Sequence, residues 1–126
     1  QVAVIKQMVK DLKLNVNVVP CPIIREEDGL AMSSRNKYLS SEERTHALVL
    51  SKSLEEAKAL IQNGTTDSLI IKKHIESIIS SVPSKIDYIE IKTQSSLQSI
   101  ETIDQPIVIA LAVFIGNTRL IDNLLI

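Results

Sequence analysis

The sequence predicts an α/β protein in which a helix and a strand are followed by a small α+β unit. Three observations predict it: residues 1–24 change from helical to strand-like apolar spacing, residues 41–82 carry two helical patterns, and residues 86–126 carry strand patterns. A polar loop, residues 25–39, separates the two parts. We therefore divide the chain into residues 1–24, 25–39 and 40–126. The last part is expected to contain two helices and a three-stranded antiparallel sheet.

The first part reads as an amphipathic helix, residues 1–14, followed by a buried strand, residues 15–24. The strand segment alternates and then runs apolar as VNVVPCPII, and Pro20 and Pro22 confine its later part to a sheet edge or a strand end. A helix followed by a strand is the unit with which an open α/β sheet ends. Residue 1 is Gln rather than Met, and no cap or turn precedes the helical pattern. We therefore expect the chain to be a C-terminal piece of a longer protein.

The third part begins with two helical segments. The first runs from Ser41 to Asn63, with apolar residues at Leu50, Leu54, Ala57 and Ile61, and Asn63-Gly64 ends it. The second begins with a cap at Thr66 or Asp67 and continues to about Val82, just before Pro83, with apolar residues at Ile71, Ile75, Ile78 and Val82. Two helices joined by so short a turn should pack as a hairpin.

Periodicity then changes to that of strands. Residues 86–93 alternate, residues 107–115 are apolar on both faces as in a covered central strand, and residues 118–126 form the third strand. Gly116-Asn117 is a hairpin turn signal between the last two strands.

Composition bounds the class of protein. The 126 residues are 44% hydrophobic, enough for one globular domain with a core. Fourteen basic and fifteen acidic residues give a net charge of −1, and only three residues are aromatic, so we expect no nucleic-acid partner. No apolar run approaches the roughly 20 residues that cross a bilayer, so we expect no membrane partner. The single cysteine excludes an internal disulfide and fits a reducing cytoplasm.

The polar loop concentrates groups that bind anions. Gly29 permits a tight turn, and two hydroxyls, a guanidinium and an amide then follow in four positions, at Ser33, Ser34, Arg35 and Asn36. Ser40 and Glu43 have capping-box spacing, so the loop should lead into the positive end of a helix. These features together predict a phosphate site. On local chemistry alone, a surface turn whose serines only cap a helix explains the pattern equally well.

The run DGLAMSSRNKYLS, residues 28–40, closely resembles the signature loop of the pantothenate synthetase family, ligases that join pantoate to beta-alanine using ATP. The resemblance extends along the rest of the chain, through RLIDN at residues 119–123. In that family the loop is similar to the mobile KMSKS loop of class I aminoacyl-tRNA synthetases, which binds ATP phosphates during adenylate formation. The resemblance implies that residues 1–24 end a Rossmann-like nucleotide-binding domain and that residues 40–126 form a lid.

The resemblance also implies the roles of individual residues. Four loop residues would bind ATP, with the hydroxyls and guanidinium on the phosphates and the methionine near adenosine: Met32, Ser33, Ser34 and Arg35. Ile24 would contact ATP through its backbone, although sequence alone favours core packing for it. In the family, the last glutamine of a KDxQQ run binds pantoate. Gln1 matches that glutamine, so the resemblance implies that it binds pantoate, and only this residue of the run is present. The family's histidine motif is not in this stretch, so no catalytic residue is predicted and the chain alone should be inactive.

The implied reaction has two steps, with Mg²⁺ accompanying ATP and a cytoplasmic homodimer as the assembly. ATP first converts pantoate to pantoyl adenylate and pyrophosphate, and beta-alanine then gives pantothenate and AMP. The alternative is a non-catalytic α+β module that binds a nucleotide or a partner protein through the same loop. Residues upstream of Gln1 would discriminate, because an enzyme needs the histidine motif and a KDxQ run there.

Several other residues resemble site residues but have simpler interpretations. The carboxylates of residues 26–28 are expected to point apart into solvent rather than to hold a metal ion. Cys21 is expected to be a buried structural thiol. His46 and His74 are expected to be surface or helix-packing residues. For the polar residues of the last strand, Arg119, Asp122 and Asn123, Arg–Asp pairing is the expected role.

Overall fold

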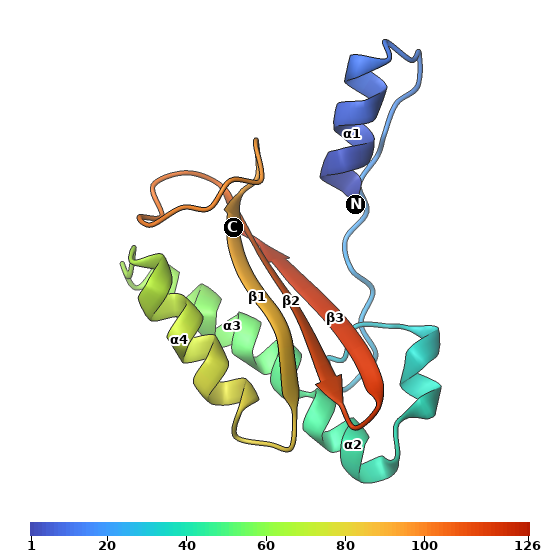
Figure 1. Ribbon diagram of the computed structural model, residues 1–126, viewed down its shortest axis with the longest axis vertical. Coiled ribbons are helices and arrows are strands. Elements are labelled where there is room, and N and C mark those ends of the chain that lie inside the picture. Colours follow the sequence, from blue (N-terminus) through green and yellow to red (C-terminus); the bar gives the residue numbers. More distant parts are fainter.

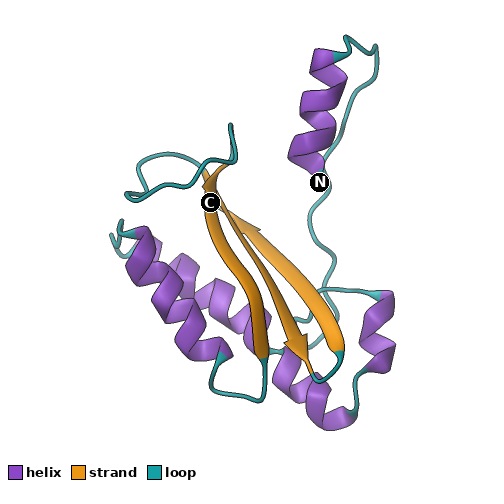
Figure 2. Cartoon of the chain, in the orientation of Figure 1, coloured by secondary structure: helices purple, strands orange, loops and turns teal.

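A three-stranded sheet with two helices packed on one face forms the body of the protein in the computed structural model, which describes residues 1–126 (Figures 1 and 2). The elements follow in the order α1 Val2–Asp11, a short 3₁₀ helix η1 Ser34–Tyr38, α2 Ser41–Ala47, α3 Val49–Gln62, α4 Ser68–Ile79, β1 Lys85–Thr93, β2 Ile107–Ile115 and β3 Thr118–Leu125. None of the helices combines the length and apolar character needed to cross a membrane.

The sheet confirms the predicted three antiparallel strands. Its order is β1-β2-β3, and the central strand β2 pairs with both neighbours, so that Leu111 lies opposite Ile89 on one side and Asp122 on the other. The register of β1 shifts between Ile86 and Tyr88, which marks a bulge. The chain turns from β2 to β3 at Gly116-Asn117, as predicted.

The core lies between the sheet and the α3–α4 hairpin, as the helical periodicity predicted. Buried apolar side chains come from both helices and from the sheet face beneath them, among them Leu50, Leu54, Ala57, Ile71, Ile75, Ile79, Ile89, Leu111 and Val113. In α4 the buried stripe is 71, 75, 79, so Ile79 occupies the position predicted for Ile78. Asp67 is the N-cap of α4, and its side chain accepts hydrogen bonds from two backbone N–H groups.

The single helix predicted from Ser41 to Asn63 is in fact two, because the chain bends at Leu48. The Leu48 N–H donates to the carbonyl of Thr45, a tighter turn than an α-helix makes, at 3.4 Å. The bend allows the two pieces to bury different surfaces. α2 lies near the end of the sheet, where Ala47 is buried, while α3 runs beneath it (Figure 1).

The strand predicted for residues 15–24 does not form, and this is the largest correction to the sequence analysis. A strand exists through its ladder of hydrogen bonds, and no strand of this chain pairs with the segment. The segment and α1 extend away from the sheet, and α1 has no buried residue (Figure 1). Cys21 is consequently exposed rather than a buried thiol.

Gly116 yields a first prediction. It has a φ of +55°, and a Cβ added there would overlap the carboxylate of Glu43, which caps α2. Gly116→Ala should therefore lower the free energy of unfolding by about 2 kcal/mol, combining left-handed strain and a lost cap. In a Glu43→Ala background only the strain remains, about 1 kcal/mol. Equal losses in the two backgrounds, measured by denaturant unfolding, would contradict this contact.

Candidate functional site

Residues 24–32 form a small irregular hairpin that leads into the SSRN segment. The Met32 N–H donates to the carbonyl of Ile24 at 2.9 Å, and the Glu26 N–H donates to that of Leu30 at 2.8 Å. The turn is closed at Gly29, whose φ of +91° is readily adopted only by glycine, as the sequence predicted. The hairpin thus delivers Met32 and the residues after it to a defined place.

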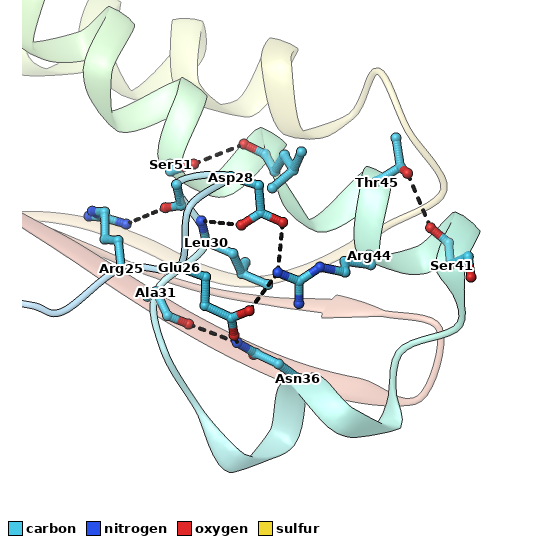
Figure 3. Close-up of polar contacts among 12 residues, drawn as sticks. Arg25, Glu26, Asp28, Leu30, Ala31, Asn36, Ser41, Arg44, Thr45 and Ser51 are labelled. Atoms are coloured by element: carbon cyan, nitrogen blue, oxygen red, sulfur yellow. Dashed lines mark hydrogen bonds and ion pairs between the residues drawn. The ribbon is translucent and has the colours of Figure 1, made fainter.

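Arg44 of α2 holds this hairpin by two carboxylates. Its Nη2 atom lies 2.6 Å from Oε2 of Glu26 and 2.7 Å from Oδ2 of Asp28 (Figure 3). The expectation that these carboxylates point apart into solvent is therefore wrong, because a guanidinium 16 and 18 residues away draws them together. No group of three or more histidine, cysteine, aspartate or glutamate side chains is arranged to hold a metal ion.

Asn36 is part of the same cluster, and its amide nitrogen is bound within the chain rather than presented to a ligand as the sequence suggested. Its Nδ2 donates to Oε1 of Glu26 at 2.6 Å and to the carbonyl of Ala31 at 3.1 Å (Figure 3). The residue is only 8% exposed. Asn36 therefore links the start of η1 to the hairpin through its Nδ2, while its buried Oδ1 has no hydrogen-bond partner. Of the other polar side chains in this run, Ser34 and Arg35 are exposed and Ser33 is partly buried.

The carboxylate cluster predicts a pH dependence. The pKa of Glu26 lies below its ordinary value of 4.5, mainly because of the hydrogen bond from Asn36 and then that from Arg44. Desolvation raises the pKa of Asp28, but hydrogen bonds from the Leu30 N–H and from Arg44 outweigh it and leave the pKa lowered.

Lowered pKa values in the folded state mean that the cluster stabilises the fold above the ordinary carboxyl pKa and loses this contribution as the pH falls through the folded values. The free energy of unfolding should therefore fall more steeply below pH 4.5 in the wild type than in Arg44→Ala. Lys52→Ala is a matched control, because its ammonium lies 4.0 Å from the nearest carboxylate and is mostly exposed. Parallel pH profiles of wild type and Arg44→Ala would contradict the assignment.

A second ion pair fixes the hairpin to the sheet. Arg25 binds Asp122 of β3 through two bonds, Nη1–Oδ2 at 2.7 Å and Nη2–Oδ1 at 3.0 Å, and its Nη1 also donates to the carbonyl of Gly29 at 3.1 Å. The hydrogen bond to Asp122 is the main reason why the pKa of Arg25 is raised, and the guanidinium remains charged. Arg119 and Asp122 of the last strand both form Arg–Asp pairs, as expected, but each pairs with a residue outside that strand. Arg119 pairs with Asp87 of β1 at 2.7 Å, and Asp122 pairs with Arg25.

A cleft of about 230 Å³ opens between the hairpin, η1 and β3. Its lining includes three of the predicted site residues, together with core residues and the polar end of β3: Ile23, Leu30, Ala31, Met32, Ser33, Arg35, Asn36, Leu50 and residues 119–123. Sequence reasoning did not include the β3 residues in the site. RLIDN could have suggested them, but nothing in the sequence indicates that they face the loop.

Arg35 differs from every other arginine in the chain. Arg25, Arg44 and Arg119 each bind a carboxylate, whereas the Arg35 guanidinium makes no hydrogen bond or ion pair with the rest of the protein. The backbone N–H of Arg35 donates to Oγ of Ser33 at 3.2 Å, which makes Ser33 the N-cap of η1. The lining of the cleft therefore includes an unpaired positive charge, at Arg35, and a hydroxyl two residues earlier, at Ser33.

The remaining predicted residues lie apart from this cleft. Ser34 is exposed in η1 but does not line the cleft. Gln1 is at the start of the separate helix α1. The Ile24 carbonyl is not free, because Met32 donates to it, and its side chain is 69% exposed rather than packed in the core.

The predicted capping box is confirmed. The Ser40 N–H donates to Glu43 at 2.8 Å, and the Glu43 N–H donates to Oγ of Ser40 at 3.2 Å. The start of α2 is therefore capped from within the chain. His74 is a helix-packing residue as expected, since its Nε2 lies 2.9 Å from Glu56 across the α3–α4 hairpin.

Comparison with known protein sequences relates this chain to a single family. The pantoate-beta-alanine ligase family model matches residues 1–125. The pantothenate synthetases of Acetivibrio thermocellus and Clostridium acetobutylicum are 54% and 56% identical to this chain, over 100% and 98% of its length. The chain spans only 45% and 44% of those two proteins, less than half of each.

Solved structures show the same relationship. The pantothenate synthetase of Thermus thermophilus superposes with a TM-score of 0.90 and 35% identity, over 98% of this chain and 45% of that one. A pantoate-beta-alanine ligase from Francisella tularensis, complexed with beta-gamma ATP and beta-alanine, has a TM-score of 0.59 and 32% identity, over 99% of this chain and 39% of that one. By the family match along nearly its whole length and by its fold, this chain belongs to the pantoate-beta-alanine ligase family.

Proposed function

We propose that this chain forms the phosphate-binding loop and lid of a pantothenate synthetase. The observation that carries the proposal is the unpaired guanidinium of Arg35, which lines a cleft beside Ser33 in a loop of the family's pattern. A cation without a protein partner is suited to an anionic ligand, and a guanidinium matches phosphate oxygens in two-point hydrogen bonding.

In the proposed reaction a carboxylate oxygen of pantoate attacks the α-phosphorus of ATP, and the bond from that phosphorus to pyrophosphate breaks. The amine nitrogen of beta-alanine then attacks the acyl carbon of pantoyl adenylate, AMP leaves, and the nitrogen loses a proton. Ser33, Ser34 and Arg35 would bind the phosphates, and Met32 would lie near adenosine. Arg35 would stabilise charge that develops as pyrophosphate leaves.

Two further contacts are proposed from the family pattern. Ile24 would contact ATP through its backbone, whose carbonyl already accepts one hydrogen bond from Met32. Gln1 would bind pantoate. Mg²⁺ would enter with ATP as part of the substrate rather than on residues of this chain, because two of the three loop carboxylates, Glu26 and Asp28, are paired with Arg44 and no group of three potential ligands is arranged to hold a metal ion.

We also propose that residues 1–24 belong to a nucleotide-binding domain and that residues 40–126 act as a lid over it. The exposed apolar side chains of residues 2–24 support this, since a surface of Val, Ile, Leu and Met normally packs against another element. A lid has a chemical purpose, because an acyl adenylate hydrolyses in water. The family resemblance also implies a cytoplasmic homodimer, and sedimentation of the full-length protein would test the dimer.

The proposed function is tested by AMP release from the full-length protein with ATP, Mg²⁺, pantoate and beta-alanine, each omitted in turn. AMP formation that requires ATP, Mg²⁺, pantoate and beta-alanine is the expected result, because AMP leaves only when beta-alanine attacks the adenylate. Residues 1–126 assayed alone should form no pantothenate. AMP release without pantoate would contradict the ligase reaction, and no AMP under any condition would favour the non-catalytic nucleotide- or partner-binding module.

A further inference from the structure

One ion pair joins the hairpin of residues 24–32 to the sheet, and its carboxylate partner, Asp122, lines the cleft. Arg44 holds the hairpin to α2, whereas Arg25 holds it to Asp122 of β3. Asp122 is on the strand that forms the opposite wall of the cleft. This ion pair and the packing of the buried Leu30 side chain in the core together hold the hairpin against the sheet.

The geometry of the pair is restrictive. The Asp122 side chain is 2% exposed, and both of its oxygens accept from Arg25. Oδ1 also accepts from the N–H of Asn123 at 2.8 Å, which fixes the carboxylate relative to the strand backbone. A planar guanidinium bound at two points has one orientation available, so Arg25 is oriented by a rigid strand.

The pair also changes the charge of the cleft. An unpaired carboxylate on the cleft wall would repel a polyphosphate, and Arg25 neutralises it at contact distance. From Arg25 the hairpin leads, through the Met32–Ile24 hydrogen bond, to the segment that begins with Ser33. A displacement at Arg25 is therefore transmitted to Ser33 and Arg35.

We propose that Asp122 is a positioning residue for the phosphate-binding loop: through Arg25 it sets where Arg35 and Ser33 lie relative to the cleft. This inference rests on the proposed function, because it takes Arg35 to be the group that binds ATP phosphates. Asp122 acts through Arg25 and touches no substrate.

The test is a double-mutant cycle in the full-length protein, with kcat/KM for ATP measured by AMP release. Asp122→Asn keeps the shape of the side chain but replaces one acceptor with a donor that faces the Arg25 guanidinium. We expect a loss of about 10²-fold, the scale of a misplaced binding group. In an Arg35→Ala background the same change should cost no more than about twofold, because the group that it positions is gone.

If Asp122 only stabilised the fold, the double-mutant cycle would give a different result. Asp67→Ala removes the N-cap of α4, which destabilises the fold away from the loop, and it should leave kcat/KM unchanged below the unfolding temperature. If Asp122→Asn lowers activity equally with and without Arg35, or not at all, the positioning role is overturned.

A second variant covers the case in which Asp122→Asn does not fold. Arg25→Lys keeps the charge opposite Asp122 but loses the two-point contact, and it should show the same dependence on Arg35. Equal losses with and without Arg35 would overturn the proposal here as well. Absence of ATP-dependent AMP formation by the wild type would instead contradict the proposed function itself, so the two failures are distinguishable.

Discussion

Arg35→Ala is expected to lower the rate of AMP formation by about 10²–10³, the usual scale for removing one electrostatic donor from a transition state. The physical reason is that Arg35 is the one arginine of the chain without a carboxylate partner, so its charge is available to the phosphates. Arg35→Lys should recover only part of the rate, because an ammonium lacks the planar two-point geometry. The rate of AMP release by the full-length protein, with saturating substrates, is the measurement.

Lys37→Ala is the matched control for this prediction. It removes the same charge two residues away, but the Lys37 ammonium lies over the Tyr38 ring, 5.2 Å from its centroid, and does not line the cleft. We expect its rate to stay close to that of the wild type. A rate for Arg35→Ala equal to that of Lys37→Ala would remove Arg35 from the mechanism.

Ile75→Ala is expected to lower the free energy of unfolding by about 2–5 kcal/mol, the range for truncating a large buried aliphatic side chain. Ile75 is 0% exposed in α4 and belongs to the core cluster beneath the sheet. The loss combines the transfer of apolar surface with the cavity left behind, and it is a large part of the roughly 5–15 kcal/mol of a whole domain. Denaturant unfolding monitored by circular dichroism measures it.

Leu69→Ala on the same helix separates core packing from helix propensity. Leu69 is 56% exposed, so its truncation should change the free energy of unfolding by no more than about 0.5 kcal/mol. Similar losses for Leu69→Ala and Ile75→Ala would mean that α4 does not present the 71, 75, 79 face to the sheet.

Features that depend on near neighbours in sequence could be predicted. The Ser40–Glu43 capping box, the Asp67 cap and the Gly116-Asn117 turn each involve groups within three residues of one another, so their residue types suffice. The period of the apolar residues similarly identified the α3–α4 hairpin and the central strand β2. The signature loop was recognised because its chemistry is concentrated in one short run.

Features that depend on distant residues could not be predicted. Apolar content alone suggested a strand at residues 15–24, but a strand needs a partner, and no strand of the chain pairs there. The sequence suggested a ligand-binding amide at Asn36, but its Nδ2 is bound by Glu26, ten residues earlier in the chain. The helical pattern from Ser41 onward contained no sign of the bend at Leu48, because the bend follows from what each half packs against.

By itself, the sequence therefore determined the three strands and the helical hairpin of the α+β unit, its caps and turns, and the short loop that carries Ser33 and Arg35, but not the division between α2 and α3. Only the tertiary structure decided which side chains of that loop remain available to a ligand. Arg25 and Asp122 are 97 residues apart, and Arg44 lies 18 residues from Glu26. Such pairs form when the folded backbone brings opposite charges within about 3 Å, and no pattern in the order of residues specifies that distance.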